Sequence, residues 1–430
     1  MSRLDGKKLL VLGNNAGSEN IVTYARSNGA YVYVADYYPK ERSSAKRLAD
    51  EALLVSTADL DALEALIRDK NIDGVLAGVS EFNLLAAMSL CERCGLPFYC
   101  TRKQWDQIEC KDQFRNLCKY YGVPSPATYY CGSSSSEVNW NLVEYPVVLK
   151  PVDSSSSAGV HFCQNKNEVL NWWGDSLSYS TRGKVILEKF CNGSEFTAHF
   201  VVCEGRAKLA CIDNRYPVSV HAGAVTTVPV ARIYPSFFTE AFEQQVARPI
   251  CSLCEGIGLI NAVMFVQGLY DEATHQFSIF EGGMRSAGEV PSRFLSYVNG
   301  LNYLGLLVDN ALSVKSDYEP ELEDPYLKGH CDGVVSFVGR GGKVGAIEGL
   351  EEAVARCQNV LDYECRYQVG STVPEGDTLR QIMVRFILDC DSREQMAQDI
   401  AFLNEAVSVQ DECGHEMVIK MDPERVFGVE

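Results

Sequence analysis

Residues 277–291 of the chain read FSIFEGGMRSAGEVP. An apolar run in this stretch ends at Glu281, Arg285 follows four residues later, and Gly288 lies just beyond. Carboxylate oxygens are ligands that magnesium prefers, and the planar fork of an arginine suits a phosphate or a carboxylate. The stretch therefore predicts a site in which Glu281 binds magnesium on nucleotide phosphates and Arg285 holds a phosphorylated intermediate.

The residues just upstream predict a β-hairpin that completes this site. Residues 262–283 contain two apolar runs around a polar turn near 271–274. In such a hairpin Gln267 faces Glu281, and both side chains offer oxygen ligands. Magnesium held there would neutralise charge that develops on the terminal phosphates of ATP during transfer. We therefore predict Gln267 and Glu281 as the metal ligands.

Two further strand ends predict contacts with a nucleotide. Lys150 ends the run YPVVLK and is followed by the small residues 153–159, which let backbone N–H groups approach phosphate oxygens. This loop is not a Walker loop, and taken alone it is more typical of a surface hairpin. The later segment LEKFCNGSEF (187–196) offers backbone groups for an adenine edge and a carboxylate for ribose. A hairpin with salt-bridged acids is the alternative interpretation of that segment.

The first third of the chain alternates apolar strands with helical patterns, which predicts a parallel sheet covered by helices. Gly13, Gly17 and Asp36 hint at a dinucleotide site, but the loop is not GxGxxG, and a tight strand-to-helix turn is the favoured interpretation. Glu81 follows a short strand at the kind of sheet edge where ligands bind in α/β folds. A solvated carboxylate at a helix N-terminus explains Glu81 equally well.

The last third predicts a separate α+β unit. The acidic stretch 316–325 resembles a domain boundary, and 331–349 is typical of a glycine-rich hairpin. A helix, a strand and a second helix follow, without a convincing catalytic cluster. The predicted fold class is therefore α/β and α+β, with several domains.

Composition excludes some classes of function. The net charge is −18 and the chain has no run of Lys and Arg, which argues against a nucleic-acid surface. No apolar segment is long enough to span a bilayer, and the N-terminus has no signal-peptide pattern. The 17 cysteines are odd in number and scattered, which favours reduced thiols and a cytoplasmic location. The CxxC at Cys91 and Cys94 lies in a helical pattern and predicts no metal site.

Four ordered segments together resemble the ATP-grasp superfamily. They are CKDQFR at 110–115, YPVVLKPVDSSSSAGV at 145–160, LEKFCNGSEF at 187–196, and FVQ with FEGGMRSAGE at 265–289. The resemblance implies a pre-ATP-grasp domain at 1–105, an ATP-grasp domain at 106–315 with a lid at about 125–187, and a C-terminal ligase-type domain at 316–430.

The resemblance also implies roles for single residues. ATP would be bound by phosphate-binding lysines, by a mobile loop, by backbone groups that contact adenine and by a carboxylate that contacts ribose. The phosphate-binding lysines would be Lys111 and Lys150, and the mobile loop would include Ser155, Ser156 and Gly159. The backbone of Glu188, Lys189 and Cys191 would contact adenine, and the Glu195 carboxylate would contact ribose. Glu281 would be the main magnesium ligand.

Two departures from the superfamily pattern narrow the resemblance. Many members have Glu-x-Asn-x-Arg, whereas here Gly283 replaces the Asn. Gln267 stands where a second acid is common. Members that resemble carbamoyl-phosphate synthase also have a glutamine at this place. The form Glu-x-x-x-Arg-x-x-Gly is similar to the L-amino acid ligases, and so is the C-terminal third. By that resemblance Arg285 and Gly288 lie near an acylphosphate and the amino-acid substrate, and His221 stands where such ligases often have a substrate-contacting histidine. Glu81, at its sheet edge, is a further substrate candidate.

The resemblance predicts a ligase that joins a carboxylate, expected to be an amino acid, to an amine through an acylphosphate. ATP and magnesium are the expected cofactors, and ADP and phosphate the expected products. No nucleic-acid or membrane partner is expected, and a homodimer is possible because family members are often dimers. Two alternatives stay open: an enzyme that makes carboxyphosphate or carbamoyl phosphate, and an ATP-binding protein that has lost catalysis.

Overall fold

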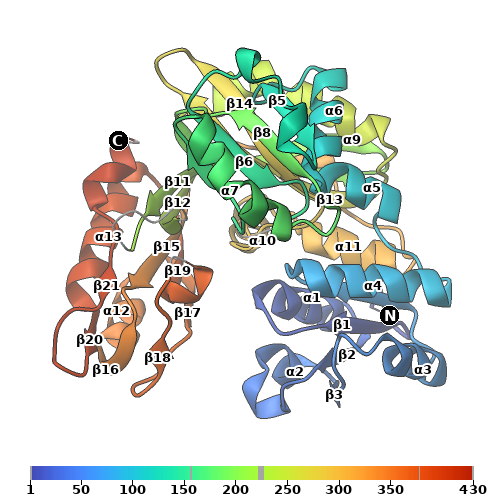
Figure 1. Ribbon diagram of the computed structural model, residues 1–430. Coiled ribbons are helices and arrows are strands. Elements are labelled where there is room, and N and C mark those ends of the chain that lie inside the picture. The colour runs from blue at the N-terminus through green and yellow to red at the C-terminus, as the bar shows by residue number, and fades with distance from the viewer. Residues whose placement is uncertain (1, 155–156, 221–226, 377, 429–430) are drawn as a thin grey trace.

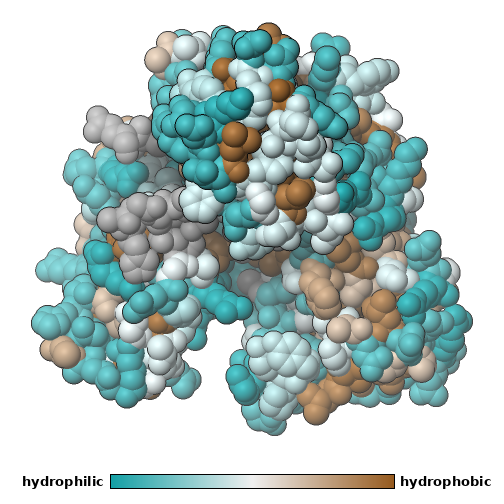
Figure 2. Space-filling model, viewed as in Figure 1, coloured by the Kyte–Doolittle hydropathy of each residue, from teal (hydrophilic) through white to brown (hydrophobic). Residues whose placement is uncertain are grey.

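The protein consists of three lobes in a computed structural model that describes residues 2–154, 157–220, 227–376 and 378–428. In Figure 1 the N-terminal lobe lies at the lower right, the C-terminal lobe at the lower left, and the central lobe above both. Figure 2 shows an open indentation between the two lower lobes. The predicted multidomain α/β and α+β architecture is confirmed. None of the described helices is long and apolar enough to cross a membrane.

The N-terminal lobe is built on a parallel sheet with the strand order β3-β2-β1-β4. Residues 8–12 and 74–77 of this sheet are almost fully buried, as expected when helices cover a parallel sheet. The strands are β1 (Lys8–Leu12), β2 (Tyr31–Asp36), β3 (Glu51–Leu54) and β4 (Gly74–Ala77), and the helices are α1 (Ala16–Ser27), α2 (Ser44–Leu48), α3 (Leu60–Lys70) and α4 (Glu81–Cys94). Helix α11 (Tyr303–Ala311), from much later in the chain, packs against α1 and β4.

The central lobe contains two antiparallel sheets. The smaller sheet has the order β5-β8-β6-β7 and its own apolar cluster, which includes Leu149, Trp173 and Leu187. Its elements are β5 (Thr128–Gly132), β6 (Val147–Pro151), β7 (His161–Cys163), β8 (Val185–Lys189) and helix α7 (Lys166–Ser178). We refer to this sheet and α7 as the lid sheet. That it moves as a lid stays a prediction.

The larger sheet of the central lobe has the order β10-β9-β13-β14. Its strands are β9 (Ser194–Cys203), β10 (Arg206–Ile212), β13 (Ala262–Asp271) and β14 (Gln276–Gly283), and the helices near it are α5 (Arg102–Glu109), α6 (Lys111–Tyr121), α8 (Thr239–Phe242) and α9 (Arg248–Gly256). Helix α10 (Ser292–Val298) follows this sheet in the chain. Strands β13 and β14 pair in antiparallel register, so the predicted hairpin at 262–283 is confirmed.

The C-terminal lobe contains the remaining two sheets. One has the order β11-β12-β15-β19-β17 with β21 paired to β15, and the other has the order β18-β16-β20. Their elements are β11 (Asn214–Val218), β12 (Val228–Tyr234), β15 (Cys331–Gly339), β16 (Gly342–Glu348), β17 (Val360–Cys365), β18 (Thr372–Val373), β19 (Ile382–Cys390), β20 (Ser408–Asp411), β21 (Val418–Ile419), α12 (Leu350–Arg356) and α13 (Arg393–Ala406). Strands β11 and β12 precede residue 316 but join the sheet that follows it, and the domain limits stay predictions.

The glycine-rich hairpin predicted at 331–349 is wrong. Strands β15 and β16 pair in different sheets: β15 with β12, β19 and β21, and β16 with β18 and β20. Gly341 and Gly342, with φ of +94° and +102°, adopt left-handed conformations that glycine accepts without strain. The Arg340 N–H donates to the Met417 carbonyl, 2.9 Å away, so the chain turns out of the first sheet instead of folding back on β15.

Two aspartates face each other inside the C-terminal sheet. Asp332 on β15 lies opposite Asp389 on β19, and the Asp332 side chain is fully buried. Burial and the neighbouring Asp389 raise the pKa of Asp332 to about 9. His330 Nδ1 lies 2.7 Å from Asp389 Oδ1, so the second aspartate already has a polar partner. Asp332 therefore keeps its proton at neutral pH.

This pair predicts a pH-dependent effect of Asp332→Asn on stability. The folded chain binds the Asp332 proton more tightly than the unfolded chain, where the pKa is about 3.9. Its contribution to the free energy of unfolding is full below about pH 4 and is lost as pH rises toward the folded-state pKa. Asparagine cannot ionise, so the Tm difference, variant minus wild type, is expected to rise from about pH 5 to about pH 8. Thermal unfolding at several pH values measures it, and a constant difference contradicts the assignment.

Candidate active site

Two of the predicted site residues face each other on the β13–β14 hairpin. Gln267 pairs directly with Glu281 across the ladder, so the two side chains lie on one face of the sheet. Both side chains are partly exposed. Gln267 Nε2 donates to Thr197 Oγ1 on the adjacent strand β9, 3.4 Å away. This face therefore offers one carboxylate and one amide oxygen, a donor set that fits magnesium.

The structure explains why Gly283 stands at the end of β14. Gly283 pairs with Phe265, and a Cβ atom at residue 283 would lie 2.3 Å from the Phe265 ring. The guanidinium of Arg285 lies 5.0 Å from the centroid of the same ring, within the range of a cation–π contact. The Phe265 ring thus occupies the space that a side chain at residue 283 would need, and it packs against the guanidinium of Arg285.

Lys150 is held in a buried ion cluster with Glu188 and Arg115, which we call the lid triad. Lys150 Nζ lies 2.8 Å from one Glu188 oxygen, and Arg115 forms two hydrogen bonds to the same carboxylate. The three side chains are at most 8% exposed. Burial lowers the pKa of Lys150, with Glu188 acting in the opposite direction. The side chain of Glu188 is therefore the counter-ion of Lys150, and the adenine contact predicted for its backbone stays a prediction.

Lys111 begins α6 and contacts the loop predicted to bind phosphates. Its Nζ donates to the Ser154 carbonyl at 2.8 Å, and its backbone N–H donates to the Val152 carbonyl at 2.8 Å. Lys111 also acts electrostatically on Lys150. The structure therefore brings both predicted lysines to one end of the loop. Ser155 and Ser156 lie outside the described residues.

Both ends of this loop are tied to α7 and to the residues after it. Gly159 has a φ of +71°, and its carbonyl accepts from Ser176 Oγ at 2.5 Å. Asp153 accepts hydrogen bonds from Ser180 Oγ at 2.6 Å and from the Arg182 N–H at 3.0 Å. These bonds anchor both ends of the segment between β6 and β7.

The other predicted nucleotide residues lie at the edge of the lid sheet and on β9. Lys189 is exposed, and its Nζ lies 3.1 Å from Glu144. Cys191 is half-buried in the loop that follows β8. Glu195 lies on β9 and forms an ion pair with Arg215, so its carboxylate is already partnered. A ribose contact by Glu195 would share or replace this ion pair.

Two of the predicted substrate residues lie near a carboxylate that the sequence analysis missed. Glu109 ends α5, and burial raises its pKa to about 7, with Glu81 and Glu281 acting in the same direction and Arg285 in the opposite one. Glu81 begins α4 at the carboxyl end of β4. Glu109 could have been suspected because it stands two residues before Lys111. His221 lies outside the described residues.

A buried polar network behind Gly288 was also missed. Arg232 Nη1 lies 2.6 Å from Asp213 and 3.3 Å from Glu289, and His199 Nε2 lies 3.7 Å from Glu289. Burial alone would raise the pKa of Glu289, but Arg232 and His199 hold it far below its usual range. The Gly288 carbonyl accepts from Arg385 Nη1 at 3.3 Å. This network fixes the segment that follows Arg285.

Comparison with known proteins identifies the fold. No family model matches the chain. The chain is 29% identical over 197 residues, 44% of its length, to a formate-dependent phosphoribosylglycinamide formyltransferase of Prochlorococcus marinus subsp. pastoris, and it spans about half the length of that relative. Its structure is similar to that of an L-amino acid ligase from Bacillus licheniformis, with a TM-score of 0.76, 17% identity, and coverage of 95% of this chain and 99% of that one.

A second structure leads to the same identification. It is the biotin carboxylase domain of the 2-oxoglutarate carboxylase from Hydrogenobacter thermophilus, with a TM-score of 0.78, 14% identity, and coverage of 98% of this chain and 94% of that one. The chain has the ATP-grasp fold. The resemblance predicted from the sequence is thereby confirmed.

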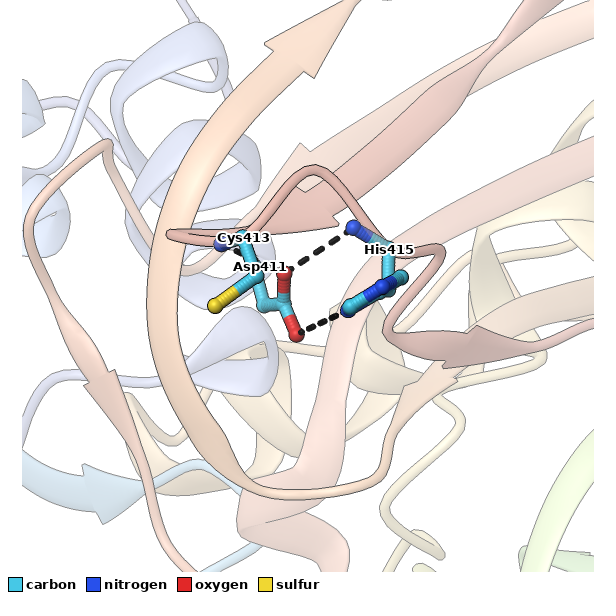
Figure 3. Close-up of side chains that lie close together, drawn as sticks. All are labelled: Asp411, Cys413 and His415. Atoms are coloured by element: carbon cyan, nitrogen blue, oxygen red, sulfur yellow. Dashed lines mark hydrogen bonds and ion pairs between the residues drawn. The ribbon is translucent and has the colours of Figure 1, made fainter.

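One further cluster of possible metal ligands lies outside this candidate site. In the turn between β20 and β21, ligand atoms of Asp411, Cys413 and His415 lie within 4.8 Å of one another, the only such group of three among the described residues (Figure 3). The three side chains come from one five-residue turn, and Asp411 already accepts the backbone N–H groups of Cys413 and His415. His415 is 80% exposed. These contacts are those of an ordinary turn.

The packing of Phe265 predicts different effects for two glycine substitutions in the candidate site. Gly283→Ala places a methyl group against the Phe265 ring, so the free energy of unfolding is expected to fall by about 1–3 kcal/mol. Gly288→Ala is the matched control, because a Cβ there has nothing within 4 Å. Thermal or denaturant unfolding of both variants measures the difference. Equal stability of the two variants would show that Phe265 moves aside freely.

Proposed function

We propose that the protein is an ATP- and magnesium-dependent ligase that joins a carboxylate to an amine through an acylphosphate. The observation that carries the proposal is the pairing of Gln267 with Glu281 on one sheet face. Arg285 follows at the strand end, and Lys150 lies 5.8 Å from the centroid of the Phe280 ring, next to Glu281. With Lys111 on the loop side, one carboxylate, one amide oxygen and three cationic side chains would serve a nucleoside triphosphate and a carboxylate substrate.

The chain's own residues account for most of the chemistry. Lys111 and Lys150 neutralise phosphate oxygens. Glu281 and Gln267 would hold magnesium, which would supply positive charge to the terminal phosphates. A carboxylate oxygen attacks the γ-phosphorus, and ADP leaves. Arg285 holds the acylphosphate until the amine nitrogen attacks its carbonyl carbon, phosphate leaves and the nitrogen loses a proton. Closure of the lid sheet excludes water, which would otherwise hydrolyse the acylphosphate.

The carboxylate and the amine are the open part of the proposal. We expect an amino acid as the carboxylate because the Glu-x-x-x-Arg-x-x-Gly form resembles amino-acid ligases. The relative that acts with formate on phosphoribosylglycinamide makes that substrate pair the second choice. Cytoplasmic location and a homodimer stay predictions.

An ADP-release screen tests the proposal. Amino acids, singly and in pairs, and formate with phosphoribosylglycinamide are expected to include a pair that stimulates ADP release and yields an amide detectable by mass spectrometry. Stimulation by bicarbonate alone would favour carboxyphosphate chemistry. ATP binding without turnover on any substrate would indicate a protein that has lost catalysis.

Glu281→Gln tests the metal assignment in the same assay. The substitution keeps the shape of the side chain but removes the charge that holds magnesium, so turnover is expected to fall on the order of 10²-fold or more. Manganese binding followed by electron paramagnetic resonance in the presence of ATP is expected to weaken in parallel. Unchanged manganese affinity would remove Glu281 from the metal site.

Two lysine substitutions compare the lid contacts. Lys150→Ala removes a phosphate ligand and leaves Glu188 with Arg115 alone, so ATP affinity is expected to fall at least about tenfold, or about 1.4 kcal/mol. Lys189→Ala is the control, because that exposed side chain pairs with Glu144. Calorimetric titration with ATP measures both variants, and circular dichroism checks their folding. Equal ATP affinity would contradict the role of Lys150.

A further inference from the structure

Arg285 lies one residue beyond a peptide segment that two side chains hold in place. The last ladder pair of β14 is Phe265 with Gly283, so the sheet no longer holds the chain at Met284. Instead the Met284 N–H donates to Glu109 Oε1 at 2.7 Å, and the Met284 carbonyl accepts from Tyr99 Oη at 2.9 Å. The Met284 side chain is fully buried. Both polar groups of this residue are therefore fixed by side chains from outside the sheet.

These contacts set the position of Arg285 from one side, as Phe265 does from the other. Arg285 Nη1 donates to the Ser286 carbonyl at 3.2 Å, and its Nε is buried without a hydrogen-bond partner among the described residues. The side chain thus depends on the backbone that carries it and on the Phe265 ring. A shift of the Met284 peptide would move the guanidinium directly.

Glu109 and Tyr99 also stand close in the chain to the nucleotide side of the site. Glu109 ends α5, and Lys111, which begins α6, contacts Ser154 in the predicted phosphate loop. One oxygen of Glu109 holds Met284, and the carboxylate is close enough to Arg285 for the two charges to interact. The junction of α5 and α6 therefore touches both the phosphate loop and the arginine segment.

We propose that Glu109 and Tyr99 are positioning residues, which clamp the Met284 peptide so that Arg285 meets the acylphosphate. The proposal rests on the proposed function for the role of Arg285, but the clamp itself does not depend on turnover. Glu109→Ala removes the acceptor of the Met284 N–H, and Tyr99→Phe removes the donor to the Met284 carbonyl. Glu109→Gln retains a side-chain oxygen that can accept the N–H, so it restores part of the clamp.

The position of Arg285 can be measured without substrates. In protein labelled with ¹⁵N-arginine, the Nε–H resonance of Arg285 is assigned by its loss in Arg285→Lys. Glu109→Ala and Tyr99→Phe are expected to shift or broaden this resonance, Glu109→Gln to do so less, and the exposed Glu92→Gln to leave it unchanged. An Arg285 resonance that stays the same in all variants would overturn the clamp, whether or not a substrate pair has been found.

Steady-state kinetics with the active substrate pair give the second readout. Glu109→Ala is expected to lower kcat on the order of 10²-fold, the typical cost of a reacting group misplaced by about 1 Å, with the KM for ATP unchanged. Glu109→Gln is expected to recover part of kcat. A shifted resonance with wild-type kcat in Glu109→Ala would overturn the positioning role. Absence of any active pair would count against the proposed function alone, because the resonance still decides the clamp.

Discussion

The lid triad is the interaction on which the site depends most. Glu188 on β8 is bound by Lys150 on β6 and by Arg115 on α6, and Arg115 Nη2 also donates to the Phe280 carbonyl on β14, 2.7 Å away. One buried carboxylate thus connects the lid sheet to the strand that carries Glu281. Loss of one partner from a buried ion cluster costs about 3–5 kcal/mol, because the remaining charge stays buried and uncompensated. The lysine predicted to meet phosphate is therefore also part of the framework.

Close packing also determines the part of the site that is predicted to bind magnesium. A glycine at residue 283 admits the Phe265 ring, and that ring supports Arg285. Residue 283 therefore offers no side-chain oxygen to a metal ion, while the guanidinium of Arg285 is held against the Phe265 ring. With Gln267 neutral, Glu281 supplies the only charge among the two predicted ligands, so magnesium would depend strongly on the phosphates of the nucleotide. This arrangement supports the proposed contact of Arg285 with an acylphosphate more than it supports a second metal ion held by protein groups.

The sequence predicted the parts of the site that depend on local patterns. Two apolar runs around a polar turn were sufficient to place Gln267 opposite Glu281, because strand register follows from the turn and the period of two. The partners of these residues were not predictable in the same way. Glu188 and Arg115 are 73 residues apart, and Met284 and Glu109 are 175 residues apart, so no local pattern links them.

The prediction of which strands pair in the C-terminal lobe was wrong for a related reason. Residues 331–349 have the composition of a hairpin, yet β15 finds better partners in β12 and β19, which come from distant parts of the chain. Strands β11 and β12 likewise cross the predicted boundary at residue 316 to join this sheet. Composition shows where strands form, whereas the choice of partner depends on which apolar faces the whole chain brings together.

The stretch from Glu109 to Arg115 shows how these distant contacts combine. Glu109 contacts the Met284 peptide, Lys111 contacts the Ser154 carbonyl, and Arg115 contacts Glu188. Two turns of chain thus touch the arginine segment, the phosphate loop and the lid sheet. These contacts connect the residues proposed to bind the nucleotide with the residue proposed to hold the acylphosphate, because Lys111, Arg115 and Glu109 lie within one short stretch of chain.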